Sequence, residues 1–295
     1  MTDPAPDTDA TLLVCCEDRP GLVAALAQGL YGLGANILDA SQHTDPVAGK
    51  FFQRIRFDYS ELAGRGVSPP SLDRLEAAIG LVAERHGMSW SLRYGAEKKR
   101  VAIFVSRTDH CLYDLLLRHR AGELTCEIPL IVSNHEKLRP VAEQFDIPFH
   151  CFPVTPATKP KVEEKQIALL REQRIDLVVL ARYMQILSED FTSAFASQII
   201  NIHHSFLPAF AGGRPYHQAY ERGVKRIGAT AHYATGDLDE GPIIEQDVIA
   251  VSHRDSPADL VRKGRDVERA VLSRAVQYHL EDRVLVYDNK TVVFD

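Results

Sequence analysis

The spacing of apolar positions along the first hundred residues predicts alternating strands and helices. A continuous apolar run begins the series at residues 11–16, and strand-like segments follow at 36–45, 50–59 and 88–94. Two sets of apolar residues recur with helical spacing between them: Leu22, Leu26, Leu30 and Leu33, and then Leu72, Leu75, Ile79 and Val82. The resulting order, βαββαβ, is that of a ferredoxin-like unit.

Beyond residue 100 the pattern changes to apolar runs separated by helical stretches, which is typical of a parallel α/β sheet. Strands are predicted at 101–106, 128–133, 148–154, 176–181 and 199–204, and helices near 110–120, 137–145, 160–174 and 188–196. A long helix at about 256–282 and a hairpin at 284–294 end the chain. We therefore expect an α/β protein in which a Rossmann-like, mostly parallel domain follows the ferredoxin-like one.

The composition places boundaries between these two domains. Residues 1–9 are acidic and Pro-rich, which predicts a flexible N-terminus, and the first domain is expected over residues 10–95. The charged segment AEKKR at 96–100 is the predicted linker, and residues 101–295 form the predicted second domain.

Charge and cysteine usage favour a cytoplasmic protein that acts on a small molecule. The net charge is −6, and no block of like charges suggests a nucleic-acid partner or a polybasic membrane segment. The N-terminus lacks the basic and apolar regions of a signal peptide. The five cysteines are odd in number and include no C-x-x-C pair, which indicates reduced thiols rather than bridges or zinc.

Polar side chains gather where the strand at 199–204 is predicted to end. They are Asn201, His203, His204 and Ser205, and a Pro- and Gly-rich loop follows them up to residue 223. Ligands of a parallel α/β sheet bind beyond the carboxyl ends of its strands, so residues 182–187 and 201–208 are the expected site. Strand alternation puts Asn201 and His203 on one face and His204 on the other.

An amide and an imidazole that converge on one atom suit acyl transfer. The Asn201 side chain would donate to an oxyanion, and His203 would move a proton to a leaving amine. The sequence has no G-x-S-x-G motif and no cysteine with an evident activating neighbour, which favours direct attack by water or an amine. A carboxylate from the turn that contains Asp237, Asp239 and Glu240 would orient His203 and favour its protonated form.

Two other interpretations of these residues remain open at this point. Asn201 and His203 also fit a hydrogen-bonded structural pair at a strand terminus, and the acidic turn also fits a solvated loop. A metal site would use His203, His204, His217, His232 and Asp239. Adjacent histidines on a strand point apart, however, and the helical spacing of a zinc protease is missing, so we expect no metal.

Three sequence blocks resemble the folate-dependent formyltransferases. They are N-I-H-x-S-x-L-P-x-F-x-G at 201–212, G-A-T-x-H at 228–232 and D-x-G-x-I-I at 239–244. From about residue 10 to 295 the chain resembles the formyltetrahydrofolate deformylase family, hydrolases that carry a fused ACT domain. His203 and His204 together resemble the hydrolases more than the transferases, in which Pro commonly takes the position of His204.

This resemblance implies hydrolysis of 10-formyltetrahydrofolate to formate and tetrahydrofolate, which supplies formate for purine synthesis and balances the one-carbon folate pool. It implies no cofactor and no metal, a folate and water as the reactants, and a homo-oligomer. Two alternatives are a formyltransferase that passes the formyl group to an amine and a regulatory protein that binds folate without turnover.

The resemblance also assigns roles to residues. Asn201 would bind the formyl oxygen, His203 would assist proton transfer, and Asp239 would set the state of His203 and of a water. The folate would contact Met184, Gln185, Ile186, Leu187, His204, Gly236 and Asp237. The ACT-like domain is either a passive dimerisation module or a regulator that binds a small amino acid through Asp18, Gly21 and Asn36.

Overall fold

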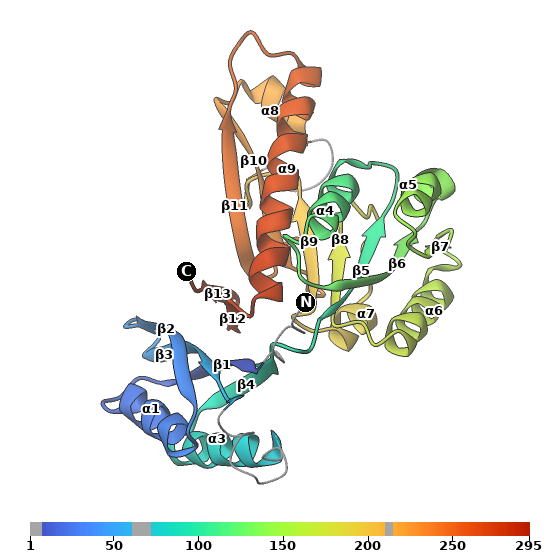
Figure 1. Cartoon of the computed structure of the whole chain (residues 1–295). Helices are drawn as coiled ribbons and strands as arrows, with labels where there is room; N and C mark the ends of the chain where they lie inside the picture. The colour runs from blue at the N-terminus through green and yellow to red at the C-terminus, as the bar shows by residue number, and fades with distance from the viewer. Residues whose placement is uncertain (1–7, 61–71, 210–214) are drawn as a thin grey trace. The chain divides into compact units, whose positions relative to one another are not determined.

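The computed structural model describes residues 8–60, 72–209 and 215–295, which form two compact units (Figure 1). One contains the described residues up to Lys98, with Asp282–Leu285 and Val292–Asp295, and the other contains Lys99–Glu281 and Val286–Thr291. The expected flexible segment at 1–9 falls mainly outside the described residues, and strand β1 begins at Asp9.

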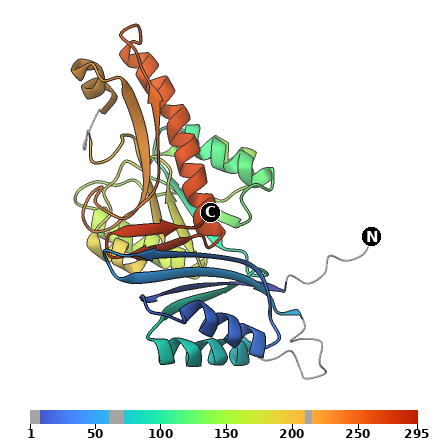
Figure 2. The same cartoon turned by 90° about the vertical axis from the view of Figure 1, so that its left-hand side faces the viewer.

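The first unit has the predicted ferredoxin-like fold. Its antiparallel sheet has the strand order β2-β3-β1-β4, and α1 and α3 cover one face (Figure 2). Leu12, Leu26 and Ile79 are buried in the core between this face and the helices. The elements are β1 (Asp9–Glu17), α1 (Leu22–Gly32), β2 (Asn36–Asp45), β3 (Lys50–Asp58), α3 (Leu72–His86) and β4 (Ser89–Tyr94).

The second unit alternates strands and helices until β9 and then adds an antiparallel edge. Its first half contains β5 (Arg100–Val105), α4 (His110–Arg120), β6 (Glu127–Ser133), η1 (Glu136–Leu138), α5 (Arg139–Gln144), β7 (Phe149–Cys151), α6 (Lys159–Glu172), β8 (Leu177–Leu180), α7 (Glu189–Ala194) and β9 (Ile199–His203). The second half contains α8 (Pro215–Arg222), β10 (Arg226–Tyr233), β11 (Ile243–Ala250) and α9 (Pro257–Leu280). The hairpin β12 (Val284–Tyr287) and β13 (Lys290–Val293) ends the chain.

The strand order of this sheet, β11-β10-β9-β8-β5-β6-β7, confirms the predicted Rossmann-like fold. Only β10 and β11 run antiparallel to their neighbours. Phe191 of α7 packs on Phe104 of β5, and Leu170 of α6 lies in the same core, whereas α4 packs against α9. The order reverses between β5 and β8, so a crevice is expected at the carboxyl ends of these strands.

Three elements differ from the sequence expectation. Strand β7 covers only part of 148–154, because it lies at the sheet edge and both Pro148 and Pro153 lack a backbone donor. Helix α8 occupies part of the expected loop at 201–223. Strand β5 begins at Arg100, the last residue of the expected linker, whose N–H donates to the Asp176 carboxylate.

Among the described residues, no helix combines the length and the apolar character that a membrane crossing requires.

Candidate active site

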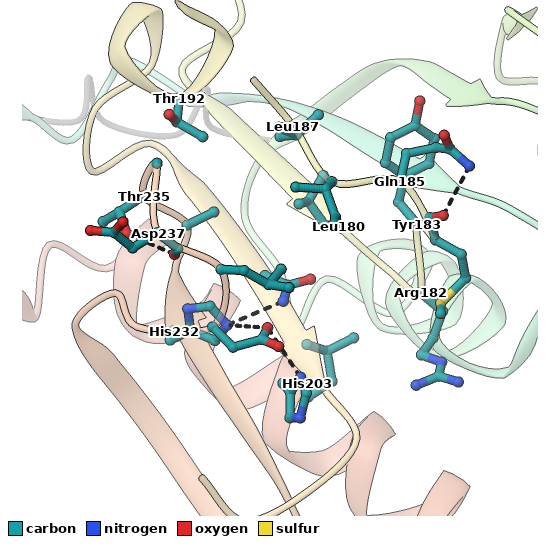
Figure 3. Close-up of a pocket in the computed structure, with 18 of the residues that line it drawn as sticks. Leu180, Arg182, Tyr183, Gln185, Leu187, Thr192, His203, His232, Thr235 and Asp237 are labelled. Carbon is teal, nitrogen blue, oxygen red and sulfur yellow. Dashed lines mark hydrogen bonds and ion pairs between the residues drawn. The ribbon is translucent and has the colours of Figure 1, made fainter. Parts of the chain in front are cut away.

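A cavity of about 330 Å³ opens at the carboxyl ends of β8 and β9 in the second unit (Figure 3). The structure brings together here all the residues predicted to be catalytic or to bind folate. Further lining residues come from β8, α7, β10 and the loop that joins β10 to β11. The cavity is lined by Leu180, Arg182, Tyr183, Met184, Gln185, Ile186, Leu187, Thr192, Asn201, Ile202, His203, His204, His232, Ala234, Thr235, Gly236, Asp237, Leu238 and Asp239.

The imidazole of His203 is held by Asp239. His203 Nδ1 lies 3.1 Å from Asp239 Oδ1, and both side chains are largely buried. A carboxylate only accepts hydrogen bonds, so Nδ1 carries the proton and Nε2 of the neutral ring keeps its lone pair. Nε2 is buried and has no hydrogen-bond partner within the part of the chain that the structure describes. The ring is therefore set up as a base whose free nitrogen is Nε2.

A second histidine, His232, orients the amide of Asn201. Its Nδ1 lies 3.0 Å from the Tyr233 carbonyl oxygen, which can only accept, so Nδ1–H is the donor and Nε2 of the neutral ring is an acceptor. Asn201 Nδ2 lies 3.1 Å from this Nε2 and donates to it. The amide nitrogen has two N–H groups, so one remains for a ligand oxygen. The sequence interpretation considered His232 only as a metal ligand and missed this role.

Asp239 lies on the loop between β10 and β11, in a backbone conformation that needs local support. Its φ is +59°, and its Oδ1 also lies 3.6 Å from His232 Nε2. Burial alone would raise the pKa of Asp239, but its interactions with the two histidines, led by the hydrogen bond that His203 donates, outweigh burial, and the net shift is downward. A Cβ at Gly241 would lie 1.8 Å from the Tyr233 carbonyl oxygen, so only glycine lets the loop close here.

Residues of the G-A-T-x-H block at 228–232 pack against and hydrogen-bond to the turn that follows β9. A Cβ at Gly228 would lie 2.5 Å from the Asp247 carbonyl oxygen and 3.1 Å from Phe206, so glycine permits close packing. The buried Thr230 hydroxyl donates to the Ser205 carbonyl and accepts from the Leu207 N–H. This block therefore fixes the chain directly after His203, and its last residue orients Asn201.

The loop after β8 provides an apolar wall. Ser106 Oγ accepts from the Met184 N–H at 2.9 Å, and Glu163 Oε1 accepts from the Ser188 N–H at 3.2 Å, so both ends of the loop are tied to the fold. Met184 and Ile186 are each 59% exposed, and Leu238 on the facing loop is 57% exposed. Exposed apolar side chains around a cavity indicate a binding surface for a flat apolar ligand.

The structure brings only part of the metal-ligand set that the sequence suggested to the cavity. His217 lies on α8 and does not line the cavity. Within the described ranges, the only trio of possible ligand atoms that lie within 4.8 Å of one another belongs to His110, Cys111 and Glu268. The guanidinium of Arg182 lies 3.5 Å from the Glu268 carboxylate of that trio. It therefore already provides the positive charge that a metal ion would bring there.

The expected regulatory residues lie around the start of α1 and β2 in the first unit. Gly21 precedes α1 with φ +93°, and the first turn of this helix carries no acidic side chain. Asn36 begins β2 and is exposed, and the Asp18 N–H donates to the Gly49 carbonyl. A helix N-terminus whose first turn carries no acidic side chain is electrostatically suited to an anion.

Part of the long sequence block at 201–212 lies outside the described residues, namely positions 210–212. The described part, from Asn201 to Ala209, is held by the contacts of Thr230 and by a hydrogen bond from Ser205 Oγ to the Ala209 carbonyl at 2.7 Å.

Comparison with known proteins matches both units. The formyl transferase family model matches residues 99–276, and the ACT domain model matches residues 10–80. The formyltetrahydrofolate deformylase of Synechocystis sp. is 55% identical over 285 residues, which cover 97% of this chain and 98% of that protein. The chain belongs to the formyltetrahydrofolate deformylase family.

The solved structures of a deformylase and of a transformylase resemble different shares of this chain. A formyltetrahydrofolate deformylase from Pseudomonas syringae pv. tomato is 48% identical with a TM-score of 0.92, covering 97% of this chain and 94% of that one. Glycinamide ribonucleotide transformylase 1 from Symbiobacterium toebii is 28% identical with a TM-score of 0.64, covering 70% of this chain and 98% of that one. The transformylase thus matches only part of a deformylase-family chain.

His204 lies differently from the sequence expectation. The alternation rule stops at His203, where β9 ends, and the His204 ring lines the same cavity with its centroid 5.3 Å from that of His203. Burial disfavours the imidazolium and the nearby Arg182 charge adds to this, which together lower the pKa of His204 to about 3. In this member of the deformylase family His204 is therefore neutral at pH 7.

This depressed pKa predicts a pH dependence of stability. The unfolded chain protonates this histidine near its ordinary pKa of about 6.5, whereas the folded protein does so only near 3, so the free energy of unfolding falls as the pH decreases between these values. When the pH is lowered from 7 to 5, the free energy of unfolding of His204→Gln is expected to fall by about 2 kcal/mol less than that of wild type. Urea unfolding at both pH values measures this difference. Equal losses in His204→Gln and the exposed-site control His253→Gln would contradict it.

Proposed function

We propose that the protein hydrolyses 10-formyltetrahydrofolate to formate and tetrahydrofolate, with Asn201, His203 and Asp239 as the catalytic residues. The observation that carries the proposal is the 3.1 Å contact between His203 Nδ1 and Asp239 Oδ1, because it leaves His203 Nε2 as a free base in the cavity. The membership in the deformylase family, with 55% identity to the Synechocystis member over nearly the whole chain, supports the same reaction.

The proposed reaction needs only water and these side chains. His203 Nε2 takes a proton as the water oxygen forms a bond to the formyl carbon, and an Asn201 N–H stabilises the resulting oxyanion. The ionised Asp239 carboxylate stabilises the imidazolium, because a nearby opposite charge favours the charged form of the ring. His203 then gives the proton to N10, the C–N10 bond breaks, and formic acid loses its remaining proton to become formate.

The folate is proposed to bind with its pterin against the apolar wall. Met184 and Ile186 present exposed side chains from one loop, and Leu238 does so from the other. Gln185, Leu187, His204, Gly236 and Asp237 complete this proposed contact set. The formyl group would then lie deeper, where the Asn201 amide and the His203 ring meet.

The alternative, transfer of the formyl group to an amine, is tested by product analysis. Purified protein is incubated with 10-formyltetrahydrofolate in the presence and in the absence of a primary amine. Hydrolysis predicts the same rate of formate release in both reactions and no formylated amine. Formylation of the amine at the expense of formate would favour the transferase.

The proposed chemistry predicts that the activity resists chelators. An amide, an imidazole, a carboxylate and water suffice for every step, so prolonged treatment with a strong chelator is expected to leave the rate of formate release unchanged. The rate is measured before treatment, after it, and after addition of zinc. A rate that the chelator abolishes and zinc restores would overturn the metal-free proposal.

For the first unit we propose a regulatory site for a small amino acid at Asp18, Gly21 and Asn36. The N-terminus of α1 would receive the carboxylate, and the exposed Asn36 side chain would bind the amino group. A homo-oligomer formed through this unit is part of the proposal, because β2 is an edge strand with the exposed apolar residues Ile37 and Leu38.

Asn36→Ala is expected to abolish any response of the activity to small amino acids and to leave turnover without effector unchanged. The reason is that an effector acts only through its different affinity for two states of the protein, and Asn36 is proposed to contact the effector alone. Activity and direct binding are measured with each common amino acid. If wild type shows neither an effect nor binding, the unit is better explained as an assembly module.

A further inference from the structure

A buried guanidinium lies in the same cavity as the proposed catalytic residues. Arg182 lies two residues after the end of β8, and its side chain is only 15% exposed. It is the only lysine or arginine among the described residues that line the cavity. In Figure 3, His232 and Arg182 lie on opposite sides of His203. The cavity therefore has a negative charge at Asp239 and a positive charge at a different wall.

The backbone of Arg182 is in the left-handed region, with φ +65°. Residues with a side chain adopt this conformation rarely, and glycine adopts it without strain. Strained positions of this kind cluster at sites where the side chain is used. Asp239, the proposed partner of His203, is the other non-glycine residue with positive φ among the described residues that line the cavity.

The donors of Arg182 are only partly used by the protein. Its Nε lies 3.5 Å from Glu268 Oε2, which is too long for a good hydrogen bond. The Glu268 carboxylate instead accepts from His110 Nε2 at 2.8 Å and from Tyr216 Oη at 2.5 Å. Within the described ranges, the guanidinium makes no hydrogen bond to another protein group. Buried polar groups normally have partners, and the Arg182 Nε is buried without one among the described residues, so the guanidinium is available to a ligand.

The chemistry of the cavity identifies this ligand. Hydrolysis of a formamide leaves formate, a small planar anion, close to the ionised Asp239, which repels it. A guanidinium fork matches the two oxygens of a carboxylate and holds its charge at every physiological pH. We propose that Arg182 binds the formate product, and that the Glu268 carboxylate only positions this guanidinium. The inference rests on the proposed hydrolysis as the source of formate.

A titration with ¹³C-labelled formate, without folate, tests this assignment independently of turnover. Arg182→Met removes the charge and keeps the apolar stem, and we expect it to weaken formate binding about tenfold to a hundredfold, the effect of losing a charge-assisted contact. Arg182→Lys keeps a charge without the fork and is expected to bind formate with intermediate affinity. Arg174→Met is the matched control, because Arg174 also has positive φ, +51°, but is exposed on the surface.

The outcomes separate this inference from the proposed function. Wild-type affinity in Arg182→Met, equal weakening in Arg174→Met, or no saturable binding to wild type at up to about 100 mM formate would overturn the formate site. Thermal unfolding confirms that each variant is folded. Formate release from 10-formyltetrahydrofolate is measured on the same preparations, and its absence in wild type would count against the hydrolysis alone.

Discussion

Replacing Asn201 with Ala is expected to lower turnover about a hundredfold to a thousandfold, the loss caused by removal of one donor to an oxyanion. The Asn201 amide gives one N–H to His232 Nε2 at 3.1 Å, and the other is the proposed donor to the formyl oxygen. This oxygen becomes negative only as water attacks, so folate affinity is expected to remain close to that of wild type.

Asn201→Asp is the matched variant, because it keeps the size of the side chain and removes the donors. Initial rates over a range of folate concentrations separate turnover from affinity. Unchanged turnover with a large loss of affinity in both variants would show that Asn201 binds folate and does not stabilise the transition state.

Asp239→Asn is expected to lower turnover further, by about ten-thousandfold, the loss observed when an aspartate-oriented histidine takes the wrong tautomer. An amide that turns its N–H toward His203 Nδ1 forces this nitrogen to accept, so the proton moves to Nε2 and the free base is lost. The variant also lacks the negative charge that stabilises the imidazolium, which is expected to shift the pH–rate profile.

The control for this change is Glu240→Gln, the same carboxylate-to-amide substitution one residue along the loop. The Glu240 side chain is exposed, and its backbone carbonyl accepts a hydrogen bond from Asn289 Nδ2 at 2.8 Å. We expect its turnover to stay close to that of wild type. Near-normal turnover and an unaltered pH–rate profile in Asp239→Asn would remove this carboxylate from the mechanism.

The positions of Asn201 and His203 followed from the sequence because they interrupt an apolar run at the carboxyl end of a strand. The alternation of side chains then placed both on one face, and the structure brings both to the cavity. The partner Asp239 came instead from the resemblance, since three acidic residues share that turn and spacing alone does not distinguish them.

His232 was missed as a positioning residue because its role depends on strand pairing. It lies within β10, and the antiparallel register of β10 on β9 sets it directly opposite Asn201. Sequence periodicity predicts the two strands but not that they are neighbours in the sheet or how they are aligned.

The sequence placed Arg182 in the expected site at 182–187 but did not indicate its role, for a similar reason. The residues around its guanidinium come from separate elements, with His110 on α4, Tyr216 on α8 and Glu268 on α9. Only the folded chain brings these side chains together. Its left-handed backbone likewise follows from the turn after β8 and not from its residue type.

The most direct test of the proposed hydrolysis is formate release from 10-formyltetrahydrofolate by the purified protein, with no amine acceptor added. Formate and tetrahydrofolate are quantified together for wild type, Asn201→Ala and Asp239→Asn. Hydrolysis by these residues predicts equal amounts of the two products from wild type, a rate lowered about a hundredfold to a thousandfold in Asn201→Ala and a rate lowered about ten-thousandfold in Asp239→Asn. No formate from wild type, or formate from the variants at the wild-type rate, would contradict hydrolysis by Asn201, His203 and Asp239.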